Sequence, residues 1–181
     1  MASARTAELF RRVDALEHAW CLRLNRGCDR RAVRELFVAV SRLGDGIFWY
    51  VLVLSLPLIY GEAGLMPALR MAIVGFTGLA LYKYLKSRLV RERPYISLSG
   101  IVPGTHALDR YSFPSGHTLH AVGFTTLMTV SFPELGWLCV PFATLVAMSR
   151  VILGLHYPTD VLAGGVIGAG LAVLSMIVMP I

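Results

Sequence analysis

Apolar residues come in long runs along this chain, and polar residues collect between the runs. About 20 residues of helix cross the apolar core of a bilayer, so the runs predict membrane-spanning helices. The five runs are Ile47–Tyr60, Met66–Leu85, His117–Phe132, Leu135–Leu155 and Val161–Ile181. The first run is the shortest and contains Pro57. To cross a bilayer it must extend toward Gly44 or Leu65, or else it lies tilted or buried in the bundle.

The N-terminal region has a different pattern, in which apolar positions recur at steps of three and four with arginines and acids between them. This spacing predicts an amphipathic helix, followed by a second, shorter one over Ala32–Leu43 that the residues LGDG should break. Such helices lie on the membrane surface or pack against a bundle, and the pattern leaves both open. The apolar positions of the first helix are Leu9, Val13, Leu16, Trp20 and Leu24.

The composition agrees with a membrane protein. Of the 181 residues, 56% are hydrophobic and only 15% are charged, and the mean hydropathy of +0.64 is too high for an ordinary soluble domain. We therefore expect a single all-α domain, an integral membrane helical bundle of about five transmembrane helices. Amphipathic surface helices should form residues 1–45, and the transmembrane part should form residues 46–181.

Charge and cysteine content limit the further possibilities. Arginines interrupt the first 30 residues, so no cleavable signal peptide is expected. Cys21, Cys28 and Cys139 are odd in number and form no close pair, which favours free thiols over disulfides or a cysteine-based zinc site. The net charge of +6 is explained more simply by anionic lipid surfaces than by nucleic acid.

If five spans alternate in direction, the polar ends of four of them meet at one membrane face. Every Lys and Arg except Arg70 falls at that face, which also holds three polar clusters. The first cluster holds Lys86 and Arg93, seven residues apart, so a helix continuing to Pro94 would present both on one side and grip an anion. The alternative is that both side chains only reach toward the interface.

The second cluster lies where the third run begins, at Pro114–His117. Ser115 suits the N-cap of a helix, with Gly116 and His117 as its first residues. The free backbone N–H groups there form an anion site, and a protonated His117 could donate its proton to a departing oxygen. Capping alone would also explain Ser115.

The third cluster joins the fourth and fifth runs and contains Arg150, His156 and Asp160. Pro158 suits the first turn of the last helix, which would let the Asp160 carboxylate reach back to His156 and orient its ring. An oriented, neutral imidazole near a phosphate is a competent nucleophile, although a His–Asp pair can also be purely structural. Together the clusters supply three cations and helix-end amides, which match the three equatorial oxygens of a phosphoryl group in transfer.

These clusters resemble the three motifs of the type 2 phosphatidic acid phosphatase superfamily, integral-membrane lipid phosphatases related to vanadium haloperoxidases and bacterial class A acid phosphatases. The resemblance implies that His156 is the nucleophile, Asp160 its partner and His117 the acid for the leaving group. It also implies that no metal and no cofactor is needed. The residues that would hold the phosphate are Lys86, Arg93, Ser115, Gly116 and Arg150. The matching positions are Lys86, Arg93 and Pro94, then Pro114–His117, then Ser149, Arg150, His156 and Asp160.

The expected function is hydrolysis of the terminal phosphate of a lipid phosphate or diphosphate, such as phosphatidate, phosphatidylglycerol phosphate or undecaprenyl diphosphate. The segment Tyr95–Phe113 should border the head group, with His106, Asp109 and Arg110 solvated. Two alternatives remain at this level. One is a non-catalytic phospholipid-binding or transport protein. The other is a metal-dependent hydrolase that uses His117, His120, His156 and Asp160.

The same charge distribution indicates which membrane face carries the active site. We expect a bacterial inner membrane protein whose active site faces the cytoplasm, because the arginine-rich N-terminal region lies at the same face and positive charge favours the inside. Family members with six spans have three before the first motif, whereas two are counted here. Lipid phosphates and membrane lipids are the expected partners, and the pattern does not decide the oligomeric state.

Overall fold

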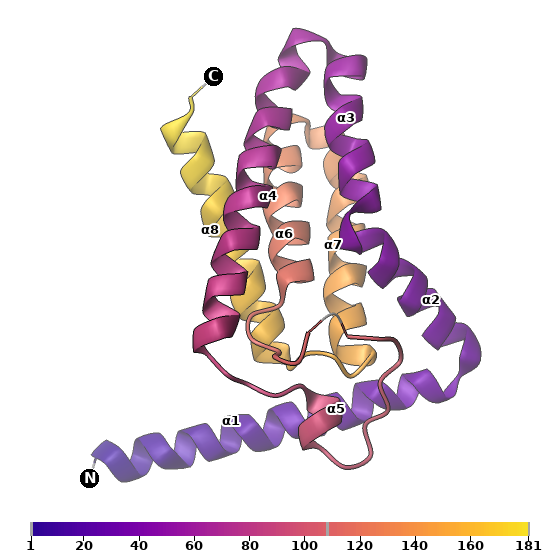
Figure 1. Cartoon of the computed structure of the whole chain (residues 1–181), viewed down its shortest axis with the longest axis vertical. Helices are drawn as coiled ribbons and strands as arrows, with labels where there is room; N and C mark the ends of the chain where they lie inside the picture. The colour runs from indigo at the N-terminus through magenta and orange to yellow at the C-terminus, as the bar shows by residue number, and fades with distance from the viewer. Residues whose placement is uncertain (1, 108, 181) are drawn as a thin grey trace.

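The structure is a computed structural model that describes residues 2–107 and 109–180. It is a helical bundle with one long helix across its end (Figure 1). Among the first ten residues only the side chain of Glu8 is described. The side chain of the predicted position Leu9 therefore lies outside the description, as does the whole of Ile181. The long helices are α1 (Ala2–Asn25), α3 (Phe48–Tyr60), α4 (Glu62–Arg88), α6 (Gly116–Ser131), α7 (Pro133–Ile152) and α8 (Pro158–Val178).

Four helical stretches among the described residues are long and apolar enough to cross a membrane. The all-α membrane bundle is therefore confirmed, but the count of five spans is not. The difference is α6, which has 16 residues, fewer than the roughly 20 that cross a bilayer, and which packs against α4, α7 and α8. The four stretches are Arg31–Tyr60, Glu62–Arg88, Pro133–Ile152 and Pro158–Val178.

The first of these stretches extends further toward the N-terminus than its apolar run. Helix α2 (Arg31–Arg42) continues through a π-helical turn, η2 (Leu43–Ile47), directly into α3. The predicted interruption at LGDG is confirmed as a kink between two helices, because the backbone leaves the helical region there. Within the turn, only Gly46 has non-helical dihedral angles, with φ at 133°.

Helix α1 lies across the end of the bundle and turns its predicted apolar stripe away from it. Leu16 and Trp20 on that stripe are 61% and 53% exposed, whereas Glu17, Cys21 and Asn25 are buried against the bundle. The Asn25 amide donates to the carbonyl of Ile152 at 3.0 Å. The face that packs on the protein thus carries the polar Glu17 and Asn25. Most of the apolar stripe is left for other contacts, although Leu24 at its end packs against the core.

Glycines allow the central helices to approach each other closely. A Cβ at Gly164 would lie 2.5 Å from the carbonyl oxygen of Ser115, and one at Gly168 would overlap the carbonyl oxygen of Leu119. With the buried Ala172, these residues form a small-residue stripe at intervals of four along α8. Small residues at this spacing let two membrane helices pack backbone to backbone. The stripe therefore fixes α8 against α6, which begins in the second polar cluster.

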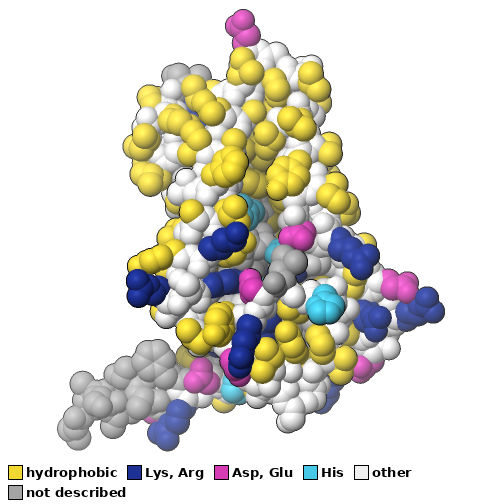
Figure 2. Space-filling model, viewed as in Figure 1, with side chains coloured by type: hydrophobic (Ala, Val, Ile, Leu, Met, Phe, Trp, Pro, Cys, Tyr) yellow, Lys and Arg dark blue, Asp and Glu magenta, His cyan; other side chains and the backbone are white. Residues whose placement is uncertain are grey.

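The two ends of the bundle differ in polarity. In Figure 2, hydrophobic side chains cover most of the upper part, and Lys, Arg, Asp, Glu and His side chains gather in the lower part. The lower end carries α1, the short helix α5 (Pro94–Ser97) and the connections at 89–115 and 153–157. Arg70 lies apart from this end, as expected, and donates to the carbonyl of Met179 near the C-terminus. All three polar clusters lie at the lower end.

Candidate active site

The connection between α7 and α8 places His156 in the interior of the lower end. The carbonyl oxygen of Arg150 accepts the amides of Leu155 and His156, both at 3.0 Å, which folds the connection back on the end of α7. Helix α8 then begins at Pro158, as predicted, and its Asp160 carboxylate caps the helix by accepting the Tyr157 amide at 2.8 Å. As a result the His156 side chain is 1% exposed.

The neighbours of the His156 ring decide which nitrogen carries the hydrogen. Nη1 of Arg93 lies 3.2 Å from Nε2. A guanidinium group only donates hydrogen bonds, so Nε2 must accept and the ring hydrogen sits on Nδ1. Burial, together with the positive charges of Arg150 and Arg93, lowers the pKa of His156 well below its usual value. The ring is therefore neutral at pH 7, with a lone pair on Nε2.

Asp160 lies beside this ring without forming the expected hydrogen bond. Its Oδ2 is 3.6 Å from Nδ1 of His156, and Nδ1 has no hydrogen-bond partner among the described residues. The distance is too long for a hydrogen bond but short enough for the negative charge to favour a positive ring. The carboxylate itself is fully buried.

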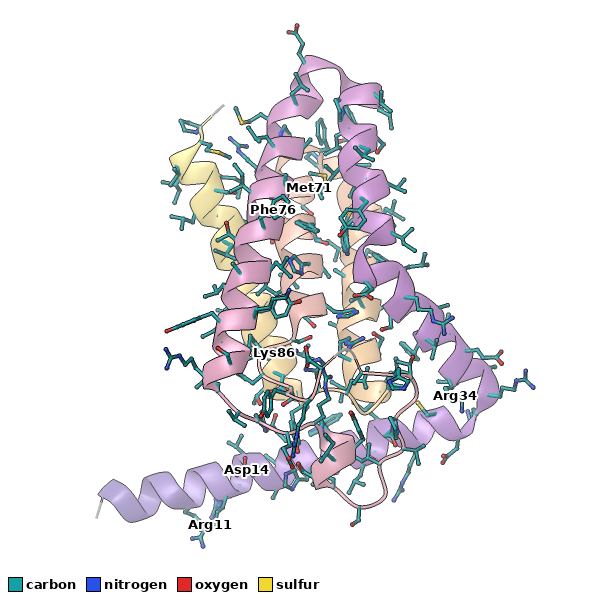
Figure 3. All side chains as sticks on the ribbon, viewed as in Figure 1. Arg11, Asp14, Arg34, Met71, Phe76 and Lys86 are labelled. Atoms are coloured by element: carbon teal, nitrogen blue, oxygen red, sulfur yellow. The ribbon has the colours of Figure 1, made fainter. Side chains whose placement is uncertain are left out.

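Lys86 and Arg93 come together, but not on one helix. Helix α4 ends at Arg88, and Arg93 adopts an extended conformation with φ −76° and ψ 153°. The prediction of a helix continuing to Pro94 is therefore wrong, because a residue before proline is disfavoured in the helical region. Lys86 extends from the lower end of α4 toward the connection that carries Arg93 (Figure 3).

Asp109 joins these two cations and was not expected to do so. Its Oδ1 accepts from Nη2 of Arg93 at 2.7 Å, and its Oδ2 accepts from Nζ of Lys86 at 2.9 Å. Asp109 is thus an ion-pair partner and not a solvated loop residue. Arg110 does point outward, where it donates to Glu92 at 2.6 Å. Burial raises the pKa of Asp109, but the hydrogen bonds from Lys86 and Arg93 outweigh burial and lower it.

The second cluster forms as predicted at the start of α6. Ser115 is the N-cap and its side-chain oxygen accepts the amide of Thr118. The Ser115 amide donates to the carbonyl of Asp160 at 3.1 Å, which joins this helix start to the third cluster. His117, on the first turn, has Nε2 at 3.2 Å from Oδ1 of Asp45, a residue of the η2 turn.

Arg91 and Glu17 are two further residues of the site that the sequence did not indicate. Arg91 donates to Oδ1 of Asp160 at 2.8 Å and to Oε2 of Glu17 at 2.7 Å, and its guanidinium lies 3.9 Å from the ring centroid of Tyr157. Glu17 also accepts the backbone amide of Thr159 at 2.8 Å. The carboxylate of Asp160 is therefore held by a residue of the 89–115 connection, which is itself held by α1. The one available sequence signal was Glu17, which shares a helix face with Cys21 and Asn25.

A cavity of about 510 Å³ connects these polar groups to an apolar slot between α3 and α4. Polar residues line its lower end, and the three exposed side chains Tyr50, Leu54 and Phe76 line its upper part, so the cavity reaches the surface between the two helices. Its volume falls in the range of ~300–1,000 Å³ that is usual for a small-molecule site. The polar lining residues are Asp45, Lys86, Arg93, Asp109, Gly116, His117, His120, Arg150 and His156.

The predicted metal ligands are not arranged as one set. The two ring nitrogens of His120 lie 3.0 and 3.1 Å from the backbone oxygens of Gly116 and Gly75. Within residues 2–107 and 109–180, no group of three His, Cys, Asp or Glu side chains has the geometry to hold a metal ion. The alternative of a metal site on His117, His120, His156 and Asp160 therefore has no structural support. The cysteines of the described chain are free.

Comparison with known proteins places this arrangement in a family. The family model described as the PAP2 superfamily matches residues 63–180, the part that holds all three clusters. The chain belongs to the PAP2 superfamily. Its fold is similar to that of a transmembrane PAP2-type phosphatidylglycerolphosphate phosphatase from Bacillus subtilis, with a TM-score of 0.71 and 26% identity, covering 90% of this chain and 84% of that one.

Two curated PAP2 relatives show how far the similarity extends. Lipid A 1-phosphatase of Rhizobium etli is 31% identical over 169 residues, which cover 81% of this chain and 72% of the relative. Undecaprenyl-diphosphatase BcrC of Bacillus subtilis is 34% identical over 97 residues, or 52% of this chain and 49% of that protein. The chain thus spans about half of BcrC but most of the lipid A phosphatase. The predicted membership of this family is confirmed.

Proposed function

We propose that this chain is a metal-independent membrane lipid phosphatase, which removes the terminal phosphate of a lipid phosphate or diphosphate through a phosphohistidine. One observation carries the proposal. The buried cations Lys86, Arg93 and Arg150 line one end of a cavity together with His117 and His156, and the other end of that cavity is apolar and open between α3 and α4. A phosphate fits the polar end, and the lipid chain extends through the apolar slot.

The residues divide the reaction between them. Lys86, Arg93, Arg150 and the amides at the start of α6 hold the three non-bridging oxygens. The lone pair on Nε2 of His156 attacks phosphorus, and Asp160 stabilises the positive ring that results. The bond to the leaving oxygen breaks, and its electron pair takes a proton from His117. Water then attacks the phosphohistidine, gives its proton to His117 and releases inorganic phosphate.

The names of the relatives cover three classes of substrate that fit this description. The names of the relatives include a lipid A phosphatase, an undecaprenyl-diphosphatase and a phosphatidylglycerophosphatase. The decisive experiment measures phosphate release by purified protein in detergent from phosphatidate, phosphatidylglycerol phosphate and undecaprenyl diphosphate. We expect release from at least one, and its loss in His156→Ala. Phosphate binding without release would instead indicate a binding or transport protein.

The chain is an integral membrane protein, and we place its active site at the cytoplasmic face of a bacterial inner membrane. The support is the arginine content of α1 and α2, which lie at the same end as the active-site cations. Labelling of Ser99→Cys, an exposed position of the 89–115 connection, tests the assignment in intact cells. Reaction with a membrane-impermeant maleimide before lysis would refute it.

A further inference from the structure

The kink between α2 and α3 places a carboxylate where neither the motifs nor the proposed function requires one. Asp45 lies at the centre of the π-helical turn, between two glycines that the geometry requires. A Cβ at Gly44 would lie 2.7 Å from Cγ2 of Val146 on α7, and Gly46 has a φ of 133°, which side chains rarely adopt. Such turns within helices are frequent at functional sites.

Asp45 points into the cavity at the first-turn histidine of α6. Its Oδ1 lies 3.2 Å from Nε2 of His117, and its side chain is 49% exposed, whereas that of His117 is 12% exposed. Within the described chain, no other carboxylate lies within ion-pair distance of His117. The carboxylate therefore approaches the acid histidine from the open side of the cavity, where the leaving oxygen must also lie.

The other charged and titratable groups around His117 are mostly positive. Cations disfavour a protonated imidazole, which is the form that a general acid needs. Asp109 is a carboxylate, but it is held by Lys86 and Arg93. Burial and these cations lower the pKa of His117 well below its usual value, and Asp45 is the carboxylate placed to oppose them. The surrounding groups are Lys86 on α4, Arg93 and Asp109 on the 89–115 connection, His120 on α6, Arg150 on α7 and His156 before α8.

We propose that Asp45 is a positioning residue for His117, which holds Nε2 of the ring at the mouth of the phosphate site and favours the protonated form that the reaction needs. The inference rests on the proposed function. When Nε2 of His156 forms its bond to phosphorus, the bond to the leaving oxygen breaks. That oxygen then takes the hydrogen from Nε2 of His117, which becomes neutral. Asp45 stays ionised throughout, and it stabilises the ring again when His117 accepts the proton of the attacking water.

Leaving-group dependence distinguishes this role from a structural one. An alkyl phosphate such as phosphatidate needs a proton on its leaving oxygen, whereas the aryl oxygen of p-nitrophenyl phosphate leaves without one. In Asp45→Asn, kcat for phosphatidate should fall about ten- to hundred-fold, part of the ~10²–10⁴ of a general acid. The kcat for the aryl phosphate, KM and inhibition by vanadate should all change less than about three-fold. Asp45→Glu, which keeps the charge, should recover part of the lost rate.

Two controls complete the experiment. Glu35→Gln removes the same charge from the exposed face of α2, where Glu35 pairs with Arg31, and should leave both rates unchanged. Adding Asp45→Asn to His117→Ala should cause no further loss, because the group that Asp45 acts through is gone. Equal losses for both substrates, no loss at all, or an additive loss in the double variant would overturn the role of Asp45. A wild-type chain that releases phosphate from no substrate would overturn the proposed function as well.

Discussion

The ion pairs of Asp109 predict that this residue competes with phosphate for the active site. Its two carboxylate oxygens contact Lys86 and Arg93, two of the three cations proposed to hold the substrate. A phosphate can bind both cations only after the carboxylate has moved away. Because its pKa is lowered below the usual value, Asp109 is ionised at neutral pH and competes fully. Asp109→Asn removes the charge and keeps the shape.

The size of the effect follows from the contacts. Hydrogen bonds to charged groups contribute ~1.5–3 kcal/mol each when well buried. The Asp109 side chain is 41% exposed, so solvent screening reduces these values, and the asparagine retains weaker hydrogen bonds of its own. A net change of about 1–2 kcal/mol remains, which corresponds to roughly 5–30-fold in affinity.

The assay is competitive inhibition by orthovanadate, which resembles the five-coordinate phosphoryl group and binds without turnover. The inhibition constant of Asp109→Asn should be lower than that of the wild type by the same roughly 5–30-fold. Glu92→Gln is the matched control, because it removes a carboxylate from the same connection that pairs only with the exposed Arg110. An unchanged constant would refute competition. A higher constant would show instead that Asp109 holds Lys86 and Arg93 in place.

Three further predictions concern the supporting structure. Gly168→Ala places a Cβ against the carbonyl of Leu119 and should destabilise the bundle by about 1–3 kcal/mol, seen as a lower thermal midpoint, whereas Gly170→Ala, which has open space, should not. Arg91→Gln leaves the buried carboxylates of Glu17 and Asp160 without their cation. The free energy of unfolding, measured by denaturation, should fall by about 3–5 kcal/mol, and kcat, measured by phosphate release, should fall as well. Because the pKa of His156 is lowered, its neutral, nucleophilic form persists below pH 6.5, so an acid-labile phosphoenzyme should still form at pH 6 and be absent in His156→Ala. A loss of phosphoenzyme centred near pH 6.5 would contradict that lowered pKa.

Hydropathy and spacing were enough to predict the helices and the face at which the polar clusters meet. The reason is that an apolar run, the N-cap at Ser115 and the proline at 158 each determine the conformation of residues close to them in the sequence. The helix through Lys86 and Arg93 was wrong because Pro94 acts on the residue before it more strongly than helical spacing does. The span count is not confirmed at α6, because this helix has only 16 residues, fewer than the roughly 20 that cross a bilayer core.

Long-range ion pairs could not be predicted in the same way. Glu17 and Arg91 are 74 residues apart, and nothing near either residue indicates the other. Asp109 looked like a loop residue because its partners, Lys86 and Arg93, lie 23 and 16 residues away. Asp45 did have a local signal in its two flanking glycines, which indicated the interruption between the two helices but not that its carboxylate faces His117.

The attachment of α1 has a practical consequence for protein production. An N-terminal helix with an exposed apolar stripe is an obvious segment to trim when a membrane protein is prepared for crystallisation. Here its Glu17 shares Arg91 with Asp160, and its Asn25 binds the end of α7. A shortened clone that begins after residue 25 would lose both attachments and leave Arg91 with a single carboxylate. Affinity tags are better added ahead of this helix than substituted for it.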